Sequence, residues 1–390
     1  MKILYYSPHP QLNLMSSAGY GTHMREMIAA FRRLGHKVYP LIMGGTKVVV
    51  DNNDSKSTGS KSTLKKVIPN IVWETLKDFN LIKNDRNAKL KLKKTVEEFQ
   101  PDLIYERANY LQTSGVEIAK EFDIFHFLEV NSPYIEERKK LQGNTLYFGS
   151  KKHEKKQLEL SDKIVVVSSA LKDYFIREQK INTNKFIITP NAINLNEIVV
   201  NNTLEINYLK DEGKLVIGFV GSFFTWHGID ILIKAFGVIQ TEFNNLNLLI
   251  VGDGDLREDL MNLTRNLGIE NKVFFTGSVK HELVYHYIDK MDICVLANSH
   301  WYGSPVKIFE YGVLGKAIIA PDNIPVKDVM VDEVDGLLIK PQINHLSESL
   351  RRLISDEKLR SRLGSSFKKK VINNHTWDNM AKKVLAEIKL

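Results

Sequence analysis

Short apolar runs alternate along the chain with longer segments in which apolar residues recur at helical spacing. Six runs in the first half predict β-strands, at 1–7, 37–43, 103–105, 124–130, 163–168 and 186–190. After the first run, apolar residues at 24, 27, 28 and 31 share one helix face and predict a helix over 22–34. Gly35 is the expected stop of this helix.

The same pattern restarts after a polar stretch at 200–214, which we interpret as a linker. Six further runs predict strands, at 215–220, 246–251, 272–276, 293–296, 317–320 and 336–339, with helices expected over 228–239 and 255–267. Strands that alternate with helices are typical of parallel sheets covered by helices. The sequence therefore predicts an α/β protein with two doubly wound, Rossmann-like domains that face a central cleft. We place these domains at 1–205, with the final helix 376–390 packing back onto it, and at 206–375.

Composition supports a soluble globular chain. The 390 residues are 43% hydrophobic and 26% charged, and the single cysteine, Cys294, lies in an apolar run that predicts a buried strand thiol. No apolar run is long enough to span a membrane, and the first residues are too short in apolar length for a signal peptide. We expect a cytoplasmic protein, with peripheral contact to the inner membrane face left open. The polar stretch 51–63 predicts a mobile loop.

Net charge is +8, which permits an anionic bilayer, a nucleic acid or a phosphorylated ligand as partner and selects none of them. Much of the excess lies over 56–94, where a solvated helix face is favoured over a membrane or acceptor contact. Neither a zinc-type cysteine spacing nor an aromatic-basic RNA-binding pattern is present. We therefore expect no metal site and no nucleic-acid partner.

The segment 302–321 carries the strongest chemical signal. Ser304 suits the N-cap of a helix and Pro305 its first position, where the missing N–H costs nothing. The amides of Val306 and Lys307 would then point out of the helix start, where the macrodipole favours an anion. The segment on its own is equally compatible with an ordinary capped helix.

Glu310 follows Pro305 by five residues, about 7.5 Å along a helix axis. With a phosphate at the helix start, its carboxylate would reach the sugar hydroxyls of the same nucleotide. The alternative is a solvated glutamate. Gly312 and Gly315 allow close packing and a left-handed stop before the next strand.

Glycine-bearing loops follow four predicted strands, at Gly19/Gly21, Gly221, Gly252/Gly254 and Gly277. Together with the helix start at Ser304 they predict a nucleotide-binding cleft. The first loop lacks the dinucleotide spacing and no Walker lysine pattern is present, so a dehydrogenase or P-loop ATPase is disfavoured.

Few basic residues are predicted near these loops. His227 precedes a helix start and, like Lys307, is a candidate to neutralise a leaving diphosphate, although a solvated cap histidine is an equal alternative. In the first domain, Glu129 and Asn131 end one strand, and the alternative for Asn131 is a turn before proline. Glu106 and Arg107 end another strand and could instead form an interdomain ion pair.

Several motifs occur together in a characteristic order: Gly19-Tyr20-Gly21, Arg33-Leu-Gly-His36, Thr189-Pro-Asn-Ala-Ile193, Gly252-Asp-Gly254, Phe275-Thr-Gly277 and the segment 304–321. In these motifs, over nearly all of its length, the chain resembles the retaining glycosyltransferases of family 4 (glycosyl transferases group 1), which have the two-domain GT-B fold. The motifs are specific for fold and nucleotide-sugar chemistry and are poor guides to the sugar or the acceptor.

The resemblance implies roles by position. Glu310 would bind the ribose hydroxyls, and the amides of Pro305 to Lys307 would hold the diphosphate. The remaining implied donor-site residues are Gly19, Tyr20, Gly21, Gly221, Ser222, Gly252, Gly254, Phe275, Gly277, Tyr302, Gly303, Ser304 and Val306. Catalytic candidates are His227, Lys307, Glu310 and Asn131, and acceptor candidates are Glu106, Arg107, Glu129 and Asn131.

Four positions depart from the family pattern. Tyr302 replaces the first glutamate of the family's pair, Ser222 replaces an arginine, His227 a lysine and Asn131 a histidine. The resemblance still implies an active, metal-independent, retaining hexosyltransferase that needs no cofactor beyond its nucleotide-sugar co-substrate.

UDP-sugars such as UDP-GlcNAc or UDP-Glc are favoured as donors. The alternatives are a GDP-mannose-dependent mannosyltransferase, a two-domain epimerase and an inactive basic binding homologue. The acceptor is expected to be a glycan, a lipid-linked glycan or a small molecule. A cationic aminocyclitol would suit the acidic residues Glu129, Glu136 and Glu137.

Overall fold

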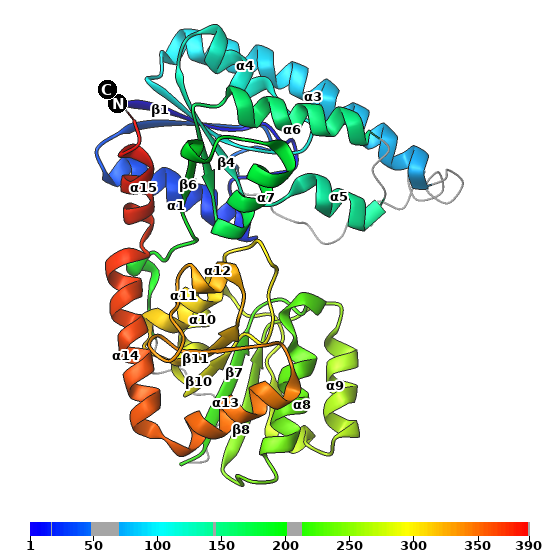
Figure 1. Cartoon of the computed structure of the whole chain (residues 1–390), viewed down its shortest axis with the longest axis vertical. Coiled ribbons are helices and arrows are strands. Elements are labelled where there is room, and N and C mark those ends of the chain that lie inside the picture. Colours follow the sequence, from blue (N-terminus) through cyan, green and yellow to red (C-terminus); the bar gives the residue numbers. More distant parts are fainter. Residues whose placement is uncertain (17, 48–69, 143–145, 201–212, 389–390) are drawn as a thin grey trace. The chain divides into compact units, whose positions relative to one another are not determined.

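The computed structural model describes residues 1–16, 18–47, 70–142, 146–200 and 213–388 (Figure 1). The predicted loop at 51–63 and nearly all of the predicted linker at 200–214 lie outside the described residues. The chain divides into two compact units, Met1–Thr189 with Trp377–Leu390, and Pro190–Thr376. The boundary between the two units lies between Thr189 and Pro190, before the expected boundary at 205.

The first unit contains a parallel six-stranded sheet in the order β2-β1-β3-β4-β5-β6. Its strands are β1 (Lys2–Ser7), β2 (Lys37–Ile42), β3 (Leu103–Arg107), β4 (Phe125–Val130), β5 (Lys163–Val166) and β6 (Phe186–Ile188). Its helices are α1 (Gly19–Arg33), α3 (Asn70–Phe99), α4 (Ser114–Glu121), α5 (Tyr134–Gln142), α6 (Tyr147–Leu160), α7 (Ser169–Gln179) and α15 (Trp377–Leu385). All six strands predicted for this half are present.

Helices bury both faces of this sheet, which explains why its strands are nearly continuous apolar runs. On one face Tyr105 packs edge-on against Phe31 of α1, with ring centroids 5.3 Å apart. On the other face Tyr6 shares a 2.7 Å hydrogen bond with Ser114 of α4. Helix α15 joins this unit through Asp378, which accepts a 2.8 Å hydrogen bond from Arg33 of α1.

Helix α1 begins at Gly19, so the prediction of a glycine loop followed by a helix from 22 was wrong. Gly21 lies in the first turn of α1. Only a glycine fits there, because a Cβ would come within 2.2 Å of the Ser16 carbonyl oxygen. Arg25 holds the preceding segment by donating to the carbonyl oxygens of Leu14 and Ser16 at 2.8 and 2.7 Å. The glycine serves close packing rather than a turn, which the sequence pattern does not distinguish.

The second unit contains another parallel six-stranded sheet, in the order β12-β11-β10-β7-β8-β9. Its strands are β7 (Leu215–Val220), β8 (Leu246–Val251), β9 (Val273–Phe275), β10 (Ile293–Val295), β11 (Ala317–Pro321) and β12 (Leu337–Ile339). Its helices are α8 (Ile229–Ile239), α9 (Arg257–Asn266), α10 (His281–Asp289), α11 (Val306–Val313), α12 (Ile324–Lys327), α13 (Ile343–Ser355) and α14 (Glu357–Asn374). The prediction of two doubly wound, Rossmann-like domains is confirmed.

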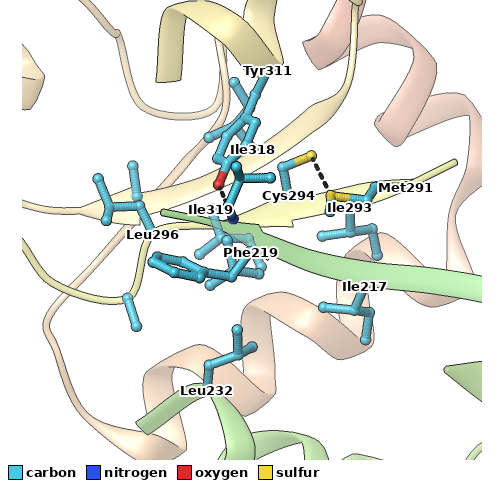
Figure 2. Packing of buried hydrophobic residues seen from close by; sticks show 14 of the residues in the cluster. Ile217, Phe219, Leu232, Met291, Ile293, Cys294, Leu296, Tyr311, Ile318 and Ile319 are labelled. Atoms are coloured by element: carbon cyan, nitrogen blue, oxygen red, sulfur yellow. Dashed lines mark hydrogen bonds between the residues drawn. The ribbon is translucent and has the colours of Figure 1, made fainter. Parts of the chain in front are cut away.

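A buried apolar core fixes α11 on the second sheet (Figure 2). Tyr311 of α11 accepts a 2.9 Å hydrogen bond from the backbone N–H of Val220 at the end of β7. Cys294 lies in the same core with its Sγ 3.7 Å from the sulfur of Met291. Burial raises the pKa of the Cys294 thiol, and the predicted buried strand cysteine is confirmed.

Helices α11 and α14 approach closely at Gly312. A Cβ at this position would lie 2.5 Å from the ring of Phe367, which is fully buried. Gly237 of α8 differs, because its Cβ would meet no atom closer than 3.4 Å.

We predict that Gly312→Ala lowers the free energy of unfolding by about 1–3 kcal/mol, because the added methyl overpacks a rigid core. The control Gly237→Ala raises it by up to about 1 kcal/mol through helix propensity. Urea-induced unfolding followed by circular dichroism measures both. Equal stability of the two variants would contradict this account of the contact between α11 and α14.

Candidate active site

Helix α11 starts at Val306 and has no side-chain cap. Pro305 is its N-cap residue, so the prediction of Ser304 as N-cap and Pro305 as first helical residue was wrong. The Ser304 hydroxyl instead accepts a 3.0 Å hydrogen bond from the backbone N–H of Asn191, and the Ser304 carbonyl accepts one of 2.6 Å from the Asn191 amide. Because Ser304 is engaged elsewhere, no side chain among the described residues caps the first-turn amides of α11, and this end of the helix is positively polarised.

Lys307 and His227 form one hydrogen-bonded pair at this helix start. The Lys307 Nζ lies 3.0 Å from His227 Nε2, and His227 Nδ1 lies 2.7 Å from the Ser222 carbonyl oxygen. Nδ1 therefore carries the proton and donates to Ser222, while Nε2 accepts from the ammonium group. Burial and the Lys307 charge lower the pKa of His227 to about 4. In this arrangement His227 is a neutral acceptor near pH 7, and the positive charge of the pair lies on Lys307.

The Lys307 amine occupies a narrow space. It lies 5.1 Å from the centroid of the Phe219 ring, and a Cβ at Gly221 would come within 3.1 Å of Nζ. Gly221 also has φ +143°, a conformation that favours glycine. Burial lowers the pKa of Lys307 to about 8, although Glu310 acts in the opposite direction. One cation with a fixed position thus lies at the start of α11.

Glu310 follows one turn further along α11 and is half-buried. None of the described residues forms a hydrogen bond or ion pair with its carboxylate. Burial raises the pKa of Glu310, while His281 and Lys307 lower it. Its carboxylate oxygens are available to accept hydrogen bonds from a ligand.

Three of the predicted glycine loops contact one another at the carboxyl ends of β7, β8 and β9. A Cβ on Gly252 would lie 2.1 Å from the Gly221 carbonyl oxygen. The Gly252 N–H donates to the carbonyl of Gly277 at 3.1 Å. A Cβ on Gly254 would lie 2.8 Å from the backbone nitrogen of Phe223. Because these glycines have no side chains, the loops after β7, β8 and β9 can lie close together beside Lys307.

Aromatic rings from the loops after β7 and β10 stack beside the Lys307–His227 pair. Phe224 stacks on Trp226 at 4.3 Å, Trp226 lies 4.5 Å from His300, and His300 stacks on Tyr302 at 5.1 Å. The ring of Trp226 is also 6.0 Å from that of His227. Of the residues in this stack, sequence reasoning singled out Tyr302 alone. The aromatic residues at 223–226 and 300–302 each follow a predicted strand, and this pattern could have indicated the stack.

Of the other donor-site candidates, Gly303 and Ser304 lie in the loop before α11 and are half-buried and buried. The Phe275 ring at the end of β9 packs edge-on against Phe223, with centroids 6.2 Å apart. Gly19, Tyr20 and Gly21 belong to the first turn of α1 in the other unit.

A second polar cluster lies in the first unit around Glu129. Its Oε1 accepts from Arg107 at 2.5 Å and from the Asn131 amide at 2.5 Å, and lies 3.2 Å from His23 Nδ1. Burial alone would raise the pKa of Glu129, but His23 and Arg107 outweigh it and lower that pKa to about 2. Sequence reasoning missed His23, whose only signal was a polar residue between the apolar positions of α1.

Glu106 does not join this cluster. It is fully buried and lies 2.9 Å from His126 Nε2, while Arg107 contacts Glu129. Successive side chains of a strand point to opposite faces, so neighbouring residues on β3 meet different partners. The grouping of Glu106 with the other acceptor candidates was wrong, and so was the alternative of a Glu106–Arg107 ion pair.

Among the described residues, no group of three or more histidine, cysteine, aspartate or glutamate side chains is arranged to hold a metal ion. No helix in the described part of the chain has both the length and the apolar character needed to cross a bilayer.

Comparison with solved structures identifies the fold class of the chain. Sucrose-phosphate synthase from Thermosynechococcus elongatus superimposes with a TM-score of 0.73 at 17% identity, over 99% of this chain and 97% of that one. HepE of Anabaena in complex with UDP superimposes with a TM-score of 0.68 at 15% identity, over 99% of both chains. At these identities the likeness shows the fold, which is GT-B.

Family models identify the chain more closely. Glycosyltransferase Family 4 matches residues 17–197, and Glycosyl transferases group 1 matches residues 201–370. The chain belongs to the group 1 glycosyltransferases. An uncharacterized glycosyltransferase of Methanocaldococcus jannaschii is 24% identical over 65% of this chain and 65% of its own length. A second from the same organism is matched over 60% of its length.

We predict that Arg107→Met lowers the free energy of unfolding by about 3–5 kcal/mol, because it removes a counter-charge from the buried Glu129 carboxylate. Lys120→Met is the control, since its ion pair with Asp162 is partly exposed to solvent and is worth at most about 1 kcal/mol. Urea-induced unfolding measures both variants. A cost for Arg107→Met no larger than that of the control would contradict the assignment.

Proposed function

We propose that the protein transfers a hexosyl group from a nucleoside diphosphate sugar to an acceptor hydroxyl, with retention of configuration and without a metal ion. One observation carries this proposal: the start of α11, which no side chain among the described residues caps, presents its first-turn amides beside the half-buried Lys307 ammonium. Such an end, at the carboxyl edge of a parallel sheet, suits a diphosphate. The family assignment supports the same reaction class.

UDP is the first nucleotide to test, because the Anabaena neighbour was solved with UDP. GDP is the second. Both would place a diphosphate at α11 and a ribose further along the helix, where the unpartnered Glu310 carboxylate would accept hydrogen bonds from the ribose hydroxyls.

Positive charge at α11 would stabilise the departing diphosphate. Lys307 carries three ammonium protons, and one of them is held by neutral His227. The remaining two would be directed at phosphate oxygens, together with the amides and the helix dipole. His227 thus acts as a positioning residue that orients the lysine.

The acceptor proton requires no protein base in this proposal. The acceptor oxygen bonds to the anomeric carbon as the bond from that carbon to the diphosphate oxygen breaks. The proton passes to the leaving phosphate on the same face of the sugar. Glu129 is a poor alternative base, because its pKa is about 2 and Oε1 already faces Arg107, Asn131 and His23.

We predict that Lys307→Met lowers kcat by about 10²–10³-fold, the loss expected when one charge-stabilising donor is removed. Lys234→Met is the matched control, because this half-exposed lysine pairs with Asp230 on α8. Release of UDP or GDP from a panel of nucleotide sugars, with and without acceptors, measures the effect. Absence of calorimetric binding for every UDP- and GDP-sugar would refute the proposal, and conversion of the donor sugar into its epimer without any acceptor would favour an epimerase.

The affinity for UDP should fall as pH rises through about 8. The Lys307 pKa is lowered to about 8, so the amine carries its charge below this pH and loses it above. His227, with a pKa of about 4, contributes no change in this range. Calorimetric titrations between about pH 7 and 9 stay above the second ionisation of a phosphate, which lies near 6. Lys307→Met should abolish the dependence, and an unchanged pH profile in that variant would contradict the assignment.

A further inference from the structure

Helix α3 presents one continuous stripe of exposed side chains. The helix lies on the outside of the first unit, beside α4 (Figure 1). Exposed positions recur along it at intervals of three and four residues, which places them on the same side of the helix. We call this surface the outer stripe of α3. It consists of Val72, Leu76, Phe79, Lys83, Arg86, Leu90 and Lys94.

Four members of the outer stripe are large apolar side chains in contact with water. Leu90 is 72% exposed, Phe79 56%, Leu76 53% and Val72 45%. A single exposed apolar side chain is ordinary on a protein surface, whereas several on one helix face form a patch. An exposed apolar patch bordered by polar residues is typical of a surface that binds a protein or a membrane.

The first three acidic side chains of α3 are turned into the protein. Glu74 and Asp78 are buried, and each lies 2.8 Å from Arg138 of α5. Asp85 is also buried and accepts a 2.8 Å hydrogen bond from the backbone N–H of Thr113. The exposed charge over most of the helix is therefore positive.

The acidic side chains of the neighbouring helix α4 are paired as well. Glu117 lies 2.5 Å from Lys89 of α3, and Glu121 lies 2.6 Å from Lys93. These two lysines flank the outer stripe and do not belong to it. The acidic residues of α4 thus compensate cations other than those of the stripe.

Two cations in the middle of the outer stripe are not compensated. Neither Lys83 nor Arg86 forms an ion pair or a side-chain hydrogen bond with a described residue. Lys94 lies 3.7 Å from Glu98, so the basic part of the stripe ends near the end of the helix. Free positive charge therefore lies between the exposed apolar side chains.

The segment that precedes α3 in the chain, 48–69, lies outside the described residues. Its sequence contains four lysines and two aspartates, so its own net charge is also positive. The run of basic residues by itself favours a solvated helix face. The apolar side chains that alternate with the exposed cations do not fit that interpretation.

We propose that the outer stripe of α3 binds the surface of an anionic lipid bilayer, with the helix parallel to the membrane plane. Leu76, Phe79 and Leu90 enter the boundary between headgroups and acyl chains. Lys83 and Arg86 contact lipid phosphates, because their long apolar stems let the charged ends reach the headgroups. A nucleic acid would match these cations and leave the apolar side chains in water.

This inference goes beyond the proposed function and is independent of it, since neither donor nor acceptor takes part in the binding. Co-sedimentation of the full chain with vesicles tests it. The protein should bind vesicles of phosphatidylcholine mixed with phosphatidylglycerol and should bind vesicles of phosphatidylcholine alone much more weakly. Raising the salt concentration from about 0.1 M to about 1 M should weaken the binding, because salt screens exposed charges. Equal binding to both vesicles, or to neither, would overturn the inference.

Replacing the two free cations measures their part. Lys83→Gln combined with Arg86→Gln should lower the partition coefficient onto the anionic vesicles by about 30-fold, or about fivefold for each cation. The matched control combines Lys358→Gln with Lys369→Gln, which removes the same charge from exposed positions on α14. Equal losses in the two pairs would show that net charge governs the binding and would overturn the role of α3.

Replacing an apolar side chain separates a bilayer from other anionic partners. Leu90→Ser should lower the partition coefficient by about tenfold, because the leucine no longer leaves water on binding. Val238→Ser on α8 is the control, since Val238 is 43% exposed and lies outside the stripe. Circular dichroism checks that each variant is folded.

Two results would contradict insertion into a bilayer. Unchanged vesicle binding by Leu90→Ser would show that the apolar side chains stay in water. Release of the protein from vesicles by single-stranded RNA, with RNA binding that depends on Lys83 and Arg86 but not on Leu90, would indicate a nucleic-acid partner instead.

Discussion

The hydrogen bond between the Lys307 ammonium and neutral His227 fixes where the positive charge lies at the start of α11. Because His227 Nδ1 donates to the Ser222 carbonyl, Nε2 must accept, and the 3.0 Å contact joins a cation to a neutral ring. A protonated imidazole here would put two cations in contact within a buried space. The pair therefore supplies one positive charge, and its position is set by the protein rather than by solvent.

This arrangement depends on how closely the backbone approaches the helix start. Tyr311 anchors α11 to the end of β7, and Gly312 brings the same helix against α14. Gly221 then leaves room for the Lys307 amine, and Gly252 lets the next loop touch Gly221. Each close approach lacks space for a side chain. The close approach of the backbone therefore restricts the position of the Lys307 side chain, although lysine side chains are usually flexible.

The sequence was sufficient for the sheets and insufficient for details that depend on distant contacts. Strands β7 and β8 have the predicted bounds, because buried parallel strands are contiguous apolar runs. Ser304 was assigned a local capping role, but Asn191, far away in sequence, binds its hydroxyl. Glu106 was grouped with Arg107 as a neighbour in sequence, although the strand turns them to opposite faces. Local propensity carries no information about such partners.

The two units differ in how their charges are compensated. In the second unit Lys307 faces a neutral histidine, and Glu310 has no partner among the described residues, so charge remains available to a ligand. In the first unit Glu129 is held by Arg107, and Arg138 by Glu74 and Asp78. Uncompensated charge favours a charged ligand, whereas paired charge leaves only neutral hydrogen-bonding groups for recognition. The second unit therefore offers charged groups to a ligand, whereas the charges of these clusters in the first unit are compensated within the protein.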